Sequence, residues 1–185
     1  MKVSREQVTE NKRVILEAAS RLFRERGFEA VTVTDIMKSA GLTHGGFYGY
    51  FQSKDDLIVQ TLAELQRSIE PFSADMATLA AQYLSLEHRD NFARGCPVAA
   101  LASDATRQPG AARAEMTAGL KRQIKLLSQI APGEDDEQKR RAAIGCWATM
   151  VGALILARMS DDVILSGEIL NKTREWLIDP EARNS

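Results

Sequence analysis

The stretch GLTHGGFYGYF, Gly41 to Phe51, decides how this sequence is interpreted, because it holds four glycines and four aromatic residues in eleven positions. Glycine disfavours helices and aromatic residues favour strands, so propensity alone predicts an edge strand or a loop. Helical periodicity dominates on both sides, however. Thr43 can cap a short helix on which Phe47 and Phe51 are i, i+4 neighbours. We therefore expect a helix of about two turns that is held by the helices around it.

The flanking segments carry the usual signals for helix ends. Gly27 follows a long apolar-faced segment as a C-terminal stop, and Pro71 ends a later one. Thr32 begins a second helix with Asp35 in capping-box position. The order is helix, short helix, glycine-containing turn, short helix, which indicates a helix-turn-helix inside a three-helix bundle. The expected flanking helices are about Thr9–Arg26, Thr32 to Gly41, and Ser53–Glu70.

Composition bounds the class of protein. The chain has 185 residues, 44% apolar and 26% charged, with five prolines, which is typical of a soluble globular protein. The segment Met1–Lys54 has nine Lys and Arg against six Asp and Glu, a net charge of +3, whereas the remainder carries −4. A basic N-terminal segment on an acidic body is compatible with nucleic-acid contact.

Several classes are disfavoured by the sequence. The start, MKVSREQVTENKR, lacks the apolar stretch of a signal peptide, so we expect a cytoplasmic protein. The most apolar run, Ala142–Ala157, is shorter than the ~20 residues of a membrane span and predicts a buried helix. Cys96 and Cys146 match no metal spacing, and His44 and His88 lie in no catalytic constellation, so we expect no cofactor, no metal and no enzyme.

A protein that reads duplex DNA needs a slim element for the major groove and anchors on the phosphates. Hydroxyls and one cation of this region can reach phosphate oxygens, while His44, Gly45 and Phe47 would face base edges. Phe47 could lie against a thymine methyl, and Phe51 points inward as core. On spacing alone, a packed connector with half-buried tyrosines is an alternative. The predicted DNA-binding residues are Thr32, Thr34, Thr43, His44, Gly45, Phe47, Tyr48, Tyr50 and Lys54.

The run GFEAVTVTDIMKSAGLTHGGFYGYFQSKDDL, Gly27–Leu57, resembles the DNA-binding region of the TetR (tetracycline-repressor) family of transcriptional regulators. The resemblance covers about Asn11 to Leu62, and Met37 and Tyr50 depart from the family pattern, where Ala and His are usual. The matching positions are Gly27-Phe28, Thr32-Val33, Ile36, Ala40-Gly41-Leu42-Thr43, Gly45, Tyr48, Tyr50, Phe51 and Lys54.

The resemblance implies an all-α fold of about nine helices and a division into two domains. Residues 1–54 would form the helix-turn-helix domain, with a linking helix over 53–70, and residues 71–185 the ligand-binding and dimerisation domain. It also implies a homodimeric repressor on double-stranded operator DNA, released by a small-molecule inducer. Control by thiol modification at Cys96, or by a protein partner, is the alternative.

The body is predicted to continue in helices. One of them carries a stripe of small residues beside a large apolar face, which we interpret as the body's own core. The stripe contacts either a neighbouring helix or the partner subunit. The predicted body helices are about Phe72–Leu86, a short one from Pro97, Ala111–Gln129, Asp136–Met159 and Asp161–Ile178. The candidate dimer-interface residues are Gly145, Thr149, Gly152, Ile169 and Leu170.

An effector pocket in the body would be lined by Met and aromatic residues, which suits an apolar or amphipathic molecule. Each candidate is either ordinary core or pocket lining. Cys96 precedes Pro97 as a helix cap, where the helix dipole and Arg94 favour the thiolate. It is therefore either a sensing thiol or a small buried cap. The candidates are Phe72, Met76, Tyr83, Phe92, Cys96, Met116, Trp147 and Met150.

Overall fold

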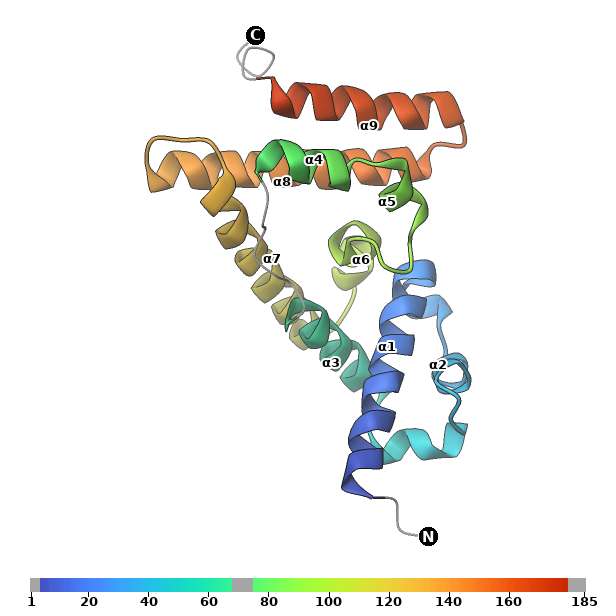
Figure 1. Ribbon diagram of the computed structural model, residues 1–185. Coiled ribbons are helices and arrows are strands. Elements are labelled where there is room, and N and C mark those ends of the chain that lie inside the picture. The colour runs from blue at the N-terminus through green and yellow to red at the C-terminus, as the bar shows by residue number, and fades with distance from the viewer. Residues whose placement is uncertain (1–3, 68–74, 180–185) are drawn as a thin grey trace. The chain divides into compact units, whose positions relative to one another are not determined.

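The structure is a computed structural model that describes residues 4–67 and 75–179. Over these residues it contains nine α-helices, one 3₁₀ helix and no strand, which confirms the predicted all-α class (Figure 1). The elements are α1 (Arg5–Ala30), α2 (Val33–Ser39), η1 (His44–Gly49), α3 (Lys54–Arg67), α4 (Met76–Tyr83), α5 (Leu86–Asp90), α6 (Pro97–Ala105), α7 (Gly110–Ile130), α8 (Asp136–Met159) and α9 (Val163–Ile178).

The chain divides into two compact units. Unit 1 comprises the described residues of Met1–Ser68 together with Ala100–Ala118, and unit 2 those of Ile69–Ala99 and Gly119–Ser185. The predicted boundary between residues 54 and 71 did not include a return of the chain to the first unit. That return has a packing reason, because Leu101, Ala105 and Ala112 are buried in the same core as α1, α2 and α3.

Gly27 marks a kink in α1 rather than its end. Its φ of 78° and ψ of 170° lie in a region open essentially to glycine alone, and the helix is assigned on to Ala30. At the kink, the Phe28 amide donates to Asp104 Oδ2 at 3.0 Å. A Cβ at Gly27 would collide with that same carboxylate oxygen. The predicted stop is therefore a real break in helical geometry with a tertiary contact built on it.

The predicted capping box of α2 is confirmed. The Asp35 amide donates to Thr32 Oγ1 at 3.1 Å, and the Thr32 amide donates to Asp35 Oδ2 at 3.0 Å. The predicted helix of about two turns is present at His44–Gly49, where it has 3₁₀ geometry. Thr43 stands at its N-cap, but its side chain makes no capping bond. Three glycines in six residues weaken α-helical geometry, and a short 3₁₀ element needs fewer consecutive bonds.

The helix after this element begins as predicted at Ser53. Its hydroxyl accepts the Asp56 amide at 3.1 Å, while Asp56 Oδ2 accepts the Gln52 amide at 2.9 Å. The helix α3 is described from Lys54 to Arg67. Its predicted end at Glu70 and Pro71 lies outside the described residues.

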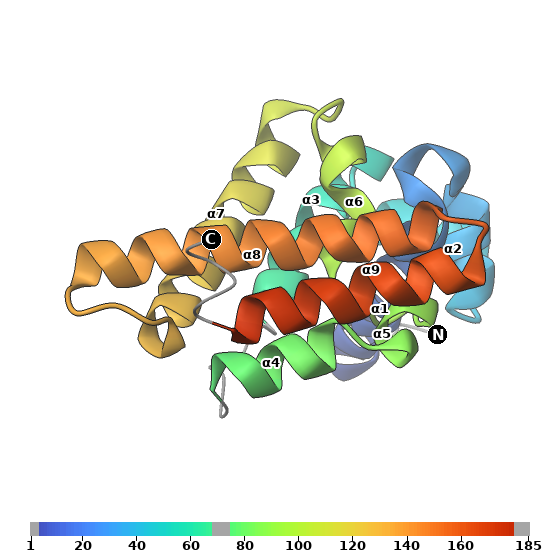
Figure 2. The same ribbon diagram turned by 90° about the horizontal axis from the view of Figure 1, so that it is seen from above.

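Unit 2 is built around α8, whose C-terminal part pairs with α9, and α4 also packs on α9 (Figures 1 and 2). The range of α8 is the predicted one, and α9 starts two residues late because Asp162 caps it by accepting the Ile164 and Leu165 amides. Of the predicted helix Phe72–Leu86, the described part is α4, and the short α5 was not predicted. Among the described helices, α8 alone has the length and apolar composition of a possible membrane span. Its large apolar face is nevertheless core, with Trp147, Met150 and Leu154 buried.

Candidate functional site

The exposed side of η1 and of the start of α2 gathers most of the predicted DNA-binding residues. Tyr48 is 70% exposed, and Thr43, His44 and Gly45 are exposed beside it. Thr34 Oγ1 and His44 Nδ1 lie 3.1 Å apart, which joins the start of α2 to the start of η1. A Cβ at Gly45 would meet nothing within 4 Å, so this part of η1 is open. The arrangement presents hydroxyls, an imidazole and bare backbone on one surface.

Tyr50 is held by a contact that the sequence does not reveal. Its hydroxyl accepts a hydrogen bond from Asn11 Nδ2 at 2.7 Å, and its side chain is half-buried. Asn11 lies on α1, 39 positions away in the chain, so no local pattern links the two residues. The tyrosine hydroxyl that was expected to reach a phosphate is therefore oriented by α1.

Phe47 corrects the sequence-based expectation. The residue is 0% exposed, stacks on Phe51 with 5.6 Å between ring centroids, and cannot lie against a thymine methyl in this structure. The neighbouring Tyr48 points outward in its place. Phe47 therefore anchors η1 to the core of unit 1, together with Phe51, which was correctly placed inside.

The two remaining DNA candidates lie at helix starts. Thr32 is exposed, but its hydroxyl donates to Asp35 Oδ2 at 2.6 Å, so its first role is the cap of α2. Lys54 is half-buried in the first turn of α3, next to the exposed Ser53. Both positions stand at amide-rich helix N-termini, which favour phosphate oxygens, and that of α2 contacts η1.

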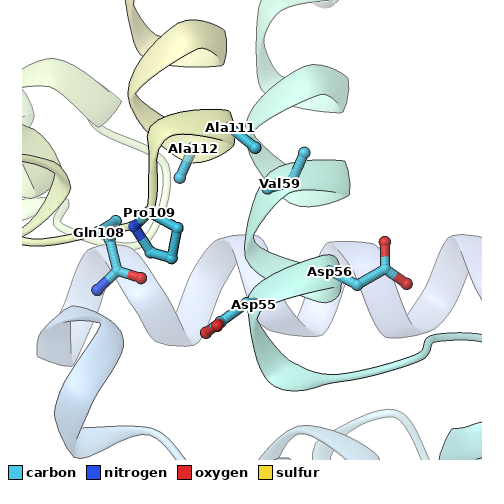
Figure 3. A pocket seen from close by; sticks show the side chains of 7 residues that line it. All are labelled: Asp55, Asp56, Val59, Gln108, Pro109, Ala111 and Ala112. Atoms are coloured by element: carbon cyan, nitrogen blue, oxygen red, sulfur yellow. The ribbon is translucent and has the colours of Figure 1, made fainter.

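Close to Lys54, a cavity of about 300 Å³ lies where the first turn of α7 meets α3 (Figure 3). Ala111 and Val59 approach each other across it, whereas the Asp56 carboxylate points away. That carboxylate is already used, since it also accepts from Gln60 Nε2 at 2.8 Å. The cavity therefore lies at the packing contact between α7 and α3 within unit 1, and we assign no ligand to it.

The effector candidates separate into different environments. Tyr83, Trp147 and Met150 are buried in the core of unit 2, with Met76 and Cys96 packed against it. Met116 packs instead on the core of unit 1, and Phe72 lies outside the described residues. Phe92 is 42% exposed, and the Arg158 guanidinium lies 4.4 Å from its ring centroid.

Around Cys96 the structure shows a hydrogen-bonded turn centred on His88. The His88 Nδ1 lies 2.7 Å from the Tyr83 carbonyl, and its Nε2 accepts the Cys96 amide at 3.0 Å. This pair of bonds requires the neutral tautomer with the proton on Nδ1. Burial lowers the pKa of His88, which also keeps the ring neutral. His88 and Arg158 were not predicted as site residues, because their partners are distant in the sequence.

The open sides of α8 and α9 form a broad apolar face, on which side chains from both helices are exposed. Gly145 and Gly152 lie on it with no neighbour within 4 Å of an added Cβ, so their stripe contacts no other helix of the described chain. Leu170 is a correction, because it is 1% exposed in the core and is not available to a partner. Thr149 and Ile169 are half-buried. The exposed apolar residues are Ile144, Ile155, Leu156, Met159, Val163, Ile164, Leu165, Trp176 and Ile178.

Comparison with known proteins agrees with the geometry. Residues 15–61 match the family model described as bacterial regulatory proteins, tetR family, and residues 74–171 match the tetracyclin repressor-like C-terminal domain. Both family models describe regulatory proteins, and their matched ranges cover the helix-turn-helix and most of the remaining helices. The chain belongs to the TetR family.

Individual relatives are distant. The chain is 29% identical to the HTH-type transcriptional repressor KstR2 of Mycolicibacterium smegmatis over 40% of this chain and 42% of that protein. It is 26% identical to an uncharacterised HTH-type regulator of Mycobacterium tuberculosis, Rv0196, over 82% of this chain and 85% of that one. The first sequence relatives are thus matched over only about two fifths of their own length. Reduced NemR of E. coli has the same fold, with a TM-score of 0.72, 20% identity and coverage of 91% and 95%.

Proposed function

We propose that the protein is a cytoplasmic homodimeric repressor that leaves its operator when a small molecule binds unit 2. The observation that carries the proposal is the pair of exposed surfaces. One is the hydroxyl-rich face of η1 and α2, and the other is the apolar face of α8 and α9.

The apolar face supports the dimer. Ile164 is 83% exposed, and Met159 and Val163 are each 75% exposed. Contiguous exposed apolar surface of this kind usually marks an interaction site. The open glycines of α8 allow a partner backbone to approach closely. Two copies of the α8–α9 pair would therefore form a four-helix interface.

The two-fold symmetry of the proposed dimer also bears on how unit 1 would bind DNA. A dimer places two copies of η1 on the same duplex, and such proteins read half-sites separated by whole helical turns. Tyr48, His44 and Lys54 are the side chains that we assign to the DNA, with Tyr48 and Lys54 on phosphates and His44 on a base edge.

The helix α6 supports a link between effector and DNA. Its first residues belong to unit 2, directly after Cys96, and its remaining residues belong to unit 1. Asp104, near its end, accepts the amide of Phe28 at the α1 kink. A ligand that binds two conformations of the turn before Cys96 with different affinities shifts the equilibrium between them. The difference in affinity limits the size of that shift, and therefore its effect on unit 1.

Titration of the DNA flanking the protein's own gene at several salt concentrations tests the DNA assignment. Lys54→Ala is expected to weaken binding to all duplexes and to reduce the slope of log K against log salt by about one. Lys121→Ala, an exposed cation on α7, is the matched control and should leave the slope unchanged. Equal slopes for both variants would sink the assignment.

A second candidate control is modification of the Cys96 thiol. It is supported by the half-buried thiol and by the Tyr83 and Arg158 side chains, which interact with it electrostatically. Operator release by a thiol-modifying reagent would be compared in wild type, Cys96→Ser and the control Cys146→Ser. Release that persists in Cys96→Ser rules this control out.

A further inference from the structure

Three buried polar atoms of unit 2 have no hydrogen-bond partner in the described part of the chain. They are the Tyr83 hydroxyl, Trp147 Nε1 and Arg158 Nη1. The Tyr83 and Trp147 side chains are only 8% and 7% exposed. A buried polar group without a partner costs about 1–3 kcal/mol, and native structures contain few of them. Three in one unit therefore require an explanation.

These atoms belong to one neighbourhood. The Tyr83 ring packs edge-on against the Trp147 ring, with 5.3 Å between centroids, and against the His88 ring at 4.6 Å. Arg158 in turn donates from Nη2 to the His88 carbonyl at 2.8 Å. The phenol therefore contacts both the indole and His88, and the guanidinium bonds the backbone of the same His88.

All three groups are hydrogen-bond donors, and one is a cation. The other guanidinium bonds of Arg158 end on the neutral carbonyls of His88 and Arg89. The nearby acid, Asp90, is paired with the Arg89 side chain at 2.7 Å. Burial lowers the pKa of Arg158, and the charge of Asp90 acts against that shift. An acceptor that carries negative charge would satisfy the phenol and the guanidinium together.

An approach to this cluster is present. A cavity of about 450 Å³ is lined by His88, Arg94 and Gly95 among others, with Glu87 also on its wall. A Cβ at Gly95 would meet Arg158 Nη2 and the Asn91 carbonyl, each at 2.7 Å. Glycine is thus required where this part of the cavity wall lies against the Arg158 guanidinium.

We propose that the Tyr83–Trp147–Arg158 cluster is the effector site and that it takes a small organic carboxylate with an apolar part. The carboxylate would accept from Arg158 Nη1 and the Tyr83 hydroxyl, with Trp147 and Phe92 against the apolar part. One guanidinium balances a monoanion, whereas a phosphate dianion would need further cations. The three atoms are closed to solvent here, so entry requires movement of residues 91–96, which lead directly into α6. This inference rests on the proposed ligand-controlled function.

Thermal unfolding of the full-length protein tests the ligand class with benzoate and hexanoate, each beside its neutral amide and beside sodium chloride at equal ionic strength. Ligands that bind the folded state raise the melting temperature. We expect the carboxylates to raise it and the amides and chloride not to. Equal effects of carboxylate, amide and chloride, or no effect of any, would overturn the proposal.

Tyr83→Phe tests whether the Tyr83 hydroxyl binds the ligand or stabilises the fold. It removes an unpaired buried hydroxyl and keeps the ring, so the free variant should be at least as stable as wild type while the carboxylate affinity falls about tenfold. Trp147→Phe is the second variant, and Gln129→Ala, at an exposed position of α7 away from this cavity, is the control. A destabilised Tyr83→Phe with unchanged carboxylate binding would overturn the proposal.

Ligand binding and operator release, measured together, distinguish the carboxylate site from the proposed release of the operator. Operator release by a neutral ligand but not by carboxylates keeps the proposed function and overturns the carboxylate site. Carboxylate binding without operator release keeps the site and overturns the proposed release.

Discussion

The two units differ in how far their polar groups are hydrogen-bonded and their apolar groups are buried. In the head, Thr34 is paired with His44 and Asn11 with Tyr50, and the recognition element is anchored by a fully buried Phe47. In the described part of unit 2, three buried donors lack partners and large apolar side chains of α8 and α9 are exposed. Unit 1 thus pairs the polar groups that surround its exposed element, whereas unit 2 leaves donors and apolar side chains on which the proposed effector site and dimer depend.

The largest expected effect on stability distinguishes two adjacent residues of η1, one buried and one exposed. Phe47→Ala empties a fully buried site and is expected to cost about 3–5 kcal/mol of unfolding free energy. Tyr48→Ala, its exposed neighbour, should change stability by less than about 0.5 kcal/mol and yet weaken operator binding. Urea denaturation and DNA titration of both variants provide the measurements. Similar losses of stability would contradict the assignment of inward and outward faces.

The second-largest effect is expected at the exposed apolar side chains of α9, in the proposed dimer interface. Ile164→Asp places a charge at an 83% exposed apolar position of α9. We expect the dimer to weaken by at least about 100-fold, which corresponds to about 2.7 kcal/mol, with little loss of secondary structure. Analytical ultracentrifugation and circular dichroism measure the two effects. Asn171→Asp, an exposed polar position on the same helix, adds the same charge as a control, and equal dissociation of both would place the interface elsewhere.

The kink in α1 predicts a smaller effect on stability. Gly27→Ala forces a side chain into a glycine backbone geometry and against Asp104, at an expected cost of about 1–3 kcal/mol. Gly45→Ala, in open space, should leave stability almost unchanged. Chemical denaturation compares the two variants, and a tolerated Gly27→Ala would show that the kink is not needed.

The smallest expected effect is a pH dependence. Burial lowers the pKa of His88 below its ordinary value of 6.5 in the folded state, so the unfolded chain binds the proton more readily. The contribution of neutral His88 is therefore complete above about pH 6.5 and is lost as the pH falls from there toward the folded pKa. Denaturation midpoints of wild type and His88→Gln between pH 7.5 and 5.5 check this. Parallel pH profiles would exclude His88 as the titrating group.

Much of the fold could be predicted because its signals are local. The capping box at Thr32, the break at Gly27 and the bounds of α8 each depend on residues within a few positions of one another. The short exposed element η1 could also be located, since its glycines and aromatic residues are close together in the sequence. What local pattern could not give was the 3₁₀ geometry of η1 and the inward direction of Phe47, because these depend on packing against α1 and α3.

The all-α class and the TetR family could be recognised in the sequence, which also predicts a DNA-reading element between Thr32 and Lys54. Tertiary structure alone decided three things. It returned residues 100–118 to the head, oriented Tyr50 by Asn11, and brought Tyr83, Trp147 and Arg158 around one turn. The physical reason is the same in each case. Helix caps and turns are satisfied by neighbours in the chain, whereas burial and unpaired donors depend on residues that only folding brings together.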